Sequence, residues 1–232
     1  MARVLVVQHT AAEGLGNFFT WLPEAGLDVH PIHPYLGHRM PTVVEGDALI
    51  VLGSPASAYD DESTPWLPAT RDLLRSAVED GVPTLGICLG AQLLARACGG
   101  EVESPASEGP ELGLSSIEVL VTDELFGPPQ TVPVIQWHHD IVRRLPDDAV
   151  VCASGALYPN QAFRLGDVAW GVQFHPEATV ELVSRWAESD VDDLAALGLR
   201  VADAVGEVRA AQVAVETAGL DLARRFAALV TG

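Results

Sequence analysis

Apolar runs alternate with stretches of helical periodicity along the first hundred residues. The runs expected to be strands are Arg3–His9, Leu27–His33, Ala48–Gly53 and Val82–Ile87. The stretches expected to be helices are Leu15–Ala25, Pro65–Asp80 with Thr64 as its N-cap, and Leu89–Cys98 closed by Gly99-Gly100. Short continuous apolar runs are typical of parallel strands that are buried on both faces. The alternation therefore predicts a doubly wound, mostly parallel α/β sheet.

The pattern changes after residue 100, where short strands are separated by Gly, Pro and Asp. The strands expected there are Ile117–Val121, Thr131–Gln136, Val150–Ser154, Ala162–Leu165 and Val168–Phe174. Such spacing predicts a small antiparallel subsheet at one edge of the parallel sheet. The last of these strands should return to the core, and Ala178–Glu188 should follow it as a helix.

Residues 188–232 form a C-terminal extension in which apolar residues recur at helical spacing. Gly219 is expected to divide this extension into two helices. We expect its apolar stripes to pack on the domain made by residues 1–187, or to form a dimer face.

Composition excludes several classes of protein. The 232 residues are 48% hydrophobic, which is enough to build a core, and the formal net charge is −19. So acidic a chain is unsuited to nucleic acid or to an anionic membrane surface. It holds no lysine, which excludes Schiff-base chemistry and a P-loop, and no apolar run reaches the length of a membrane span. The first apolar run is too short for a signal peptide. The three cysteines are expected to be reduced thiols in the cytoplasm.

Cys88 lies between a predicted buried strand and a predicted helix, in the motif Gly86-Ile87-Cys88-Leu89-Gly90. Gly-x-Cys-x-Gly is the pattern of a nucleophile elbow, in which glycines allow a sharp turn that exposes the central residue. The following helix start favours a thiolate and a developing oxyanion. The alternative is a buried structural cysteine, which is how we interpret Cys98 and Cys152 because they lack this context.

A nucleophilic cysteine needs a base, and the base needs a group that orients it. His175-Pro176-Glu177 supplies both at the end of a predicted core strand. Residues two apart on an extended backbone point to the same side, so Glu177 could hold one ring nitrogen of His175 while the other faces sulfur.

Two acidic or histidine-rich clusters have competing interpretations. His138, His139 and Asp140 could join Cys88 and His175 in a metal site, but their spacing suits no standard zinc pattern, and we predict no metal and no cofactor. Asp60-Asp61 is interpreted as a turn and capping feature.

Three segments resemble the hallmarks of class I glutamine amidotransferases. Residues 81–92 resemble their nucleophile motif, residues 171–177 their histidine-and-glutamate motif, and Leu52-Gly53-Ser54-Pro55 their oxyanion strand. The resemblance covers roughly residues 1–187 and is closest to the subgroup similar to the amidotransferase domain of GMP synthase. It implies a flavodoxin-like sheet and a cysteine enzyme that releases ammonia from glutamine through a γ-glutamyl thioester.

The resemblance also implies a role for individual residues. Cys88 would attack, His175 would shuttle protons and Glu177 would orient it. The backbone N–H groups of Ser54 and Leu89 would form the oxyanion hole beside Gly53. The residues that match substrate-binding positions are Gly53, Gln92, Trp137, His138, His139 and Asp140, with Glu111 near the pocket. Family members often have glycine where His139 stands.

Three functions remain open at this stage. The chain could supply ammonia to a synthase, which would have to be a separate polypeptide because no ATP-binding motif is present; the C-terminal extension could then be its docking site. It could instead hydrolyse γ-glutamyl amides or peptides without a partner. The third alternative, from a different class, is a non-catalytic binding protein on the same scaffold.

Overall fold

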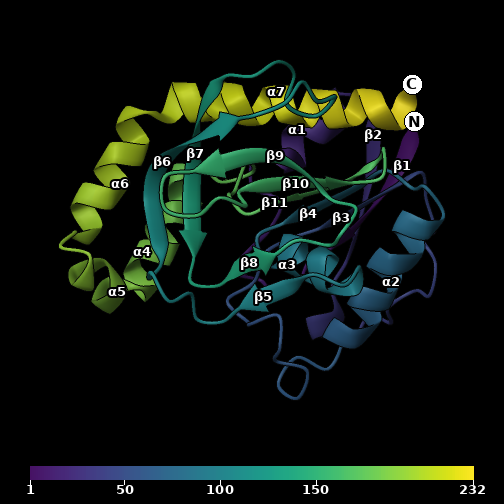
Figure 1. Ribbon diagram of the computed structural model, residues 1–232, viewed down its shortest axis with the longest axis horizontal. Coiled ribbons are helices and arrows are strands. Elements are labelled where there is room, and N and C mark those ends of the chain that lie inside the picture. Colours follow the sequence, from purple (N-terminus) through teal and green to yellow (C-terminus); the bar gives the residue numbers. More distant parts are fainter.

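The core of the protein is a nine-stranded sheet whose first half is parallel (Figure 1). In the computed structural model, which describes residues 1–232, the parallel strands are β1 (Ala2–Val7), β2 (Leu27–Ile32), β3 (Ala48–Val51), β4 (Thr84–Ile87) and β11 (Ala169–Val172). They lie in the order β2-β1-β3-β4-β11. The structure thus confirms the doubly wound sheet, with β11 as the fifth parallel strand.

Helices cover both faces of this parallel half. The helices of this half are α1 (Phe18–Glu24), the short 3-10 helix Pro34–Leu36, α2 (Leu67–Glu79) and α3 (Leu89–Ala97). Alternate residues of β1 face opposite layers: Val4 and Val6 join the core beneath α1, while Leu5 and Val7 join the core beneath α2 and α3. The carboxyl ends of β3, β4 and β11 therefore open at one edge between two helical layers.

Antiparallel strands extend the sheet beyond β11. They are β10 (Ala162–Leu165), β9 (Val150–Gly155), β6 (Glu111–Val119) and β7 (Thr131–His138), in that order. A separate two-stranded sheet is made by β5 (Glu101–Glu103) and β8 (Ile141–Arg144). The sequence pattern missed β5, β8 and the first residues of β6, because Glu111–Ser116 gains strand structure only by pairing with residues 133–138 of β7.

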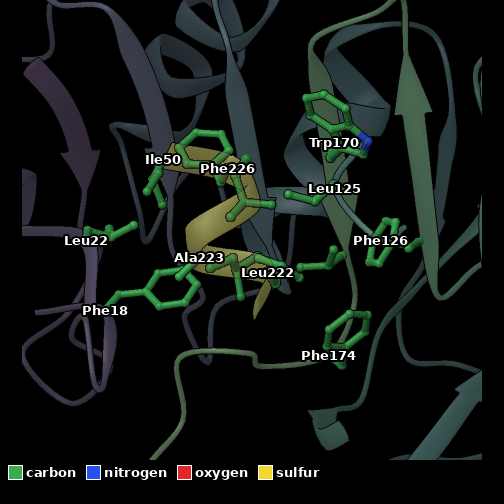
Figure 2. Packing of buried hydrophobic residues seen from close by; sticks show 14 of the residues in the cluster. Phe18, Leu22, Ile50, Leu125, Phe126, Trp170, Phe174, Leu222, Ala223 and Phe226 are labelled. Carbon is green, nitrogen blue, oxygen red and sulfur yellow. The ribbon is translucent and has the colours of Figure 1, made fainter. Parts of the chain in front are cut away.

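Four helices complete the chain: α4 (Val180–Ser189), α5 (Val191–Ala196), α6 (Val201–Ala210) and α7 (Gln212–Thr231). The expected break at Gly219 is wrong, since α7 runs through it and the chain turns instead at Ala211. A side chain at Gly219 would collide with the Pro176 carbonyl oxygen, so this glycine serves a close helix–loop contact. Leu222 and Phe226 of α7 pack against Phe18 and Ile50 in the main core (Figure 2). The boundary at residue 187 stays a prediction.

The predicted start of α2 is also wrong. The helix begins at Leu67 after Trp66, and Thr64 makes no cap because it lies in the turn that leads into the helix. Asp60 accepts a hydrogen bond from the Ser57 N–H in that turn, and Asp61 pairs with Arg71. No helix of the protein is both long enough and apolar enough to span a bilayer.

Candidate active site

Cys88 stands on a sharp turn between β4 and α3. It is the single non-glycine residue with positive φ, at φ 51° and ψ −107°, a conformation that costs roughly 1–3 kcal/mol. Its two glycine neighbours make the turn feasible. A Cβ at Gly86 would lie 2.6 Å from the Gly90 carbonyl carbon, and a Cβ at Gly90 would collide with the Val51 carbonyl oxygen. The motif therefore has the strained geometry expected of a nucleophile elbow.

The thiol of Cys88 is enclosed by protein. The residue is 6% exposed, and its sulfur donates a long hydrogen bond of 3.8 Å to the Trp137 carbonyl oxygen. Burial raises the pKa of the Cys88 thiol, whereas the charge of the nearby His175 lowers it. Thiolate formation therefore depends on a positively charged neighbour, and His175 supplies that charge.

His175 and Glu177 meet through a turn rather than through an extended strand. β11 ends at Val172, and the Ala178 N–H donates back to the His175 carbonyl oxygen. His175 Nδ1 nevertheless lies 2.7 Å from Glu177 Oε1, and both side chains are buried. Burial alone would lower the pKa of His175, but the negative charges of Glu177 and Cys88 outweigh it and raise this pKa well above its usual value. The pair can therefore hold a proton beside the sulfur.

Trp186 of α4 covers this histidine. The two ring centroids are 4.7 Å apart, and the Trp186 indole N–H is buried without a hydrogen-bond partner. The backbone of His175 is also fixed, because its N–H donates to the Ile135 carbonyl oxygen of β7. Packing from α4 and hydrogen bonding to β7 thus set the position of the imidazole.

The segment after β3 borders both Cys88 and His175. A Cβ at Gly53 would be in ordinary contact with Cys88 Cβ at 3.4 Å but would press on His175 Cε1 at 3.1 Å. The side chain of Ser54 turns into its own loop, where its hydroxyl accepts a hydrogen bond from the Ala56 N–H. Leu89, the other predicted oxyanion donor, is the first residue of α3 and follows the nucleophile directly.

Gln92 and the loop after β7 gather on the α3 side of Cys88. Gln92 Nε2 donates to the Asp140 carbonyl oxygen at 3.0 Å. His138 Nε2 lies 3.1 Å from Glu111 Oε2, which also accepts a hydrogen bond from Gln161 Nε2. Glu111, noted in the sequence, therefore supports the loop through His138.

Trp137 and His139 point toward the C-terminal helices instead. Trp137 Nε1 donates to Asp190 Oδ2 at 2.7 Å, and His139 Nε2 lies 3.1 Å from Asp193 Oδ2 near the surface. It is the Trp137 backbone carbonyl, not its ring, that faces the thiol. Because the side chains of His138 and His139 diverge, the two histidines do not form a common set of metal ligands.

The sequence analysis missed two ionisable groups at the same edge, the buried His9 and the half-buried Glu13. Glu13, in the loop after β1, has one carboxylate oxygen buried without a hydrogen-bond partner. Burial raises the pKa of Glu13 to about 7, with His175 opposing the shift and Glu177 and Asp190 adding to it. Burial lowers the pKa of His9 to about 4, so His9 is neutral and accepts a hydrogen bond from Trp66 Nε1. The sequence did hold a signal for them, because both residues follow a predicted parallel strand, and ligand sites lie at the carboxyl ends of such strands.

Comparison with known proteins links this geometry to one family. The family model described as glutamine amidotransferase class-I matches residues 24–185. Over 217 residues and 90% of both chains, the protein is 33% identical to the glutamine amidotransferase-like protein YfeJ of Salmonella typhimurium. A solved glutamine amidotransferase from Thermotoga maritima, 27% identical, superposes with a TM-score of 0.85 over 97% of each chain.

Two further relatives match a shorter part of the chain. Gamma-glutamyl peptidase 4 of Arabidopsis thaliana is 33% identical over 137 residues, which are 56% of this chain and 53% of that protein. GMP synthase of Porphyromonas gingivalis is 37% identical over 150 residues, which are 63% of this chain but 28% of the synthase.

Proposed function

The chain belongs to the class I glutamine amidotransferase family, and from this premise we propose that it hydrolyses γ-glutamyl amide bonds through a thioester on Cys88. The observation that carries the proposal is the strained Cys88 beside a buried His175 whose Nδ1 is held by Glu177. A purely structural cysteine has no need of that backbone strain or of a charged pair at its side.

The proposed reaction proceeds in two halves. His175 takes the thiol proton of Cys88, and sulfur attacks the γ-carbonyl carbon of the substrate. The oxygen becomes an oxyanion, which we assign to the backbone N–H groups of Ser54 and Leu89. The C–N bond then breaks, His175 gives its proton to the leaving nitrogen, and a γ-glutamyl thioester remains. His175 next takes a proton from water, whose oxygen attacks the thioester, and glutamate leaves as the thiol regains its proton.

The amino-acid end of the substrate is assigned to Gln92 and the loop of residues 137–140. Gln92 ties α3 to this loop through the Asp140 carbonyl, and Asp190 and Asp193 hold the loop from the C-terminal side. The similarity to gamma-glutamyl peptidase 4 supports a hydrolase of γ-glutamyl bonds, and we therefore favour a stand-alone hydrolase of γ-glutamyl amides or peptides.

The second candidate is a glutaminase that passes ammonia to a separate synthase. It is favoured by the similarity to GMP synthase, of which this chain matches 28% of the length. Its surface for the synthase would be the C-terminal helices 188–232. A non-catalytic binding protein is the third candidate.

The experiment measures glutamate formation with glutamine and with a γ-glutamyl anilide in parallel, with Cys88→Ala as the blank. We expect turnover of the anilide by the isolated protein, and a loss of about a thousandfold or more in Cys88→Ala with an unchanged circular dichroism spectrum. Turnover of glutamine alone would favour the ammonia-supplying subunit. Turnover that survives in Cys88→Ala would refute the mechanism. No turnover of either compound would favour the binding protein or a glutaminase that its synthase must switch on.

A further inference from the structure

The carboxyl group of Glu13 faces the reacting groups but takes no part in the mechanism above. Its Oε2 atom is buried, and no donor of the protein bonds to it. A Cβ at Gly53 would lie 2.5 Å from this oxygen, 3.1 Å from His175 Cε1 and 3.4 Å from Cys88 Cβ. The carboxylate, the imidazole and the nucleophile-bearing carbon therefore all lie close around Gly53.

Glu13 and Gln92 lie on different segments beside Cys88. Glu13 follows β1, and β3 separates β1 from β4 in the sheet. Gln92 and Asp140 lie instead on the side of α3 and β7–β8. A γ-glutamyl substrate bound there, with its carbonyl carbon at Cys88, would direct its leaving group toward Gly53 and Glu13.

The charges around Glu13 favour a cation. The groups that act on its carboxylate are the positive His175 and the negative Glu177 and Asp190, and no arginine bonds to it. A buried carboxylate without a partner is unfavourable, and pairing with a positive group removes that penalty. The same carboxylates would repel a leaving group that carries a negative charge.

We propose that Glu13 selects the leaving group, and that the preferred substrates are γ-glutamyl amides whose leaving amine bears a second, positively charged nitrogen. The inference rests on the proposed hydrolysis and narrows its substrate class. The C–N bond still breaks with the proton coming from His175, and the diamine departs whole. Glu13 forms no covalent bond; it binds the distal ammonium group.

The test compares three γ-glutamyl amides of equal chain length, made from a diaminoalkane, a plain alkylamine and an ω-amino acid. We expect kcat/KM of the wild-type protein to be highest for the cationic amide, by tenfold or more, roughly what a charge-assisted hydrogen bond supplies. In Glu13→Gln the ratio of the cationic to the neutral amide should fall by about tenfold, mostly through KM. Glu188→Gln, which removes the same charge from an exposed position on α4, should keep the wild-type ratio.

An unchanged ratio in Glu13→Gln, or a wild-type preference for the neutral or anionic amide, would overturn the inference. Turnover of the neutral amide that depends on Cys88 tests the hydrolysis separately. If no amide is hydrolysed, calorimetry still decides: Cys88→Ala should bind the cationic amide about tenfold more tightly than the neutral one, and Cys88→Ala with Glu13→Gln should not. Equal binding by both proteins would refute the role of Glu13 whatever the activity.

Discussion

Replacing Glu13 by glutamine should make the stability of the protein less sensitive to pH between 4.5 and about 7. Glutamine keeps the shape of the side chain and removes its charge. Burial raises the pKa of Glu13 from 4.5 to about 7 in the folded protein, while the unfolded chain keeps the ordinary value. Between these two pKa values the folded state holds a proton that the unfolded state has lost.

The sign and size of the effect follow from this difference in proton binding. The folded state binds more protons in the window from 4.5 to about 7, so the free energy of unfolding falls as the pH rises through it. A shift of this size corresponds to about 3 kcal/mol at pH values above the window. The glutamine variant does not ionise. The difference in unfolding free energy between variant and wild type should therefore grow by about 3 kcal/mol across the window.

The assay is equilibrium unfolding in urea at a series of pH values. The difference between variant and wild type is needed because the ionisation of His9 changes the free energy of unfolding with pH in the opposite direction. Burial lowers its pKa from 6.5 to about 4, so its contribution is present above 6.5 and is lost as the pH falls toward 4. Glu188→Gln is the control for the loss of one surface charge and should give a flat difference. A difference for Glu13→Gln that is also flat to within about 0.5 kcal/mol would refute the buried, unpaired carboxylate.

Two further predictions concern the histidine pair and the helix behind it. Steady-state assays should find that kcat of Glu177→Ala stays about tenfold or more above kcat of His175→Ala. The reason is that orienting a base is less essential than being the base. The reverse order would mean that the two roles are misassigned. Gly219→Ala should lower the free energy of unfolding measured in urea by about 1–3 kcal/mol and should reduce activity. The added Cβ would press on the carbonyl of Pro176, which lies between His175 and Glu177. Gly206→Ala, in α6 with open space around it, should stabilise by about 0.5–1 kcal/mol, and equal effects of the two substitutions would contradict this packing argument.

The parallel half of the sheet and the Cys88 turn could be predicted because their causes are local. Strands such as Val82–Ile87 are continuous apolar runs, and the strain at Cys88 needs glycines only two residues away. Gly219 was misinterpreted because its cause is not local. A glycine in a helical pattern favours a helix break, but this one allows close contact with the Pro176 carbonyl, more than forty positions earlier in the chain.

The sequence by itself determined the order of the elements in the parallel half, the nucleophile candidate and the two residues proposed to activate it. Only the tertiary structure decided what surrounds them. The Glu13 carboxylate beside Gly53, the Trp186 ring on His175 and the Asp190 contact with Trp137 each join residues far apart in the chain. Periodicity reports which face of an element is buried, but not which distant group meets it there. The charge balance of the site therefore comes from packing.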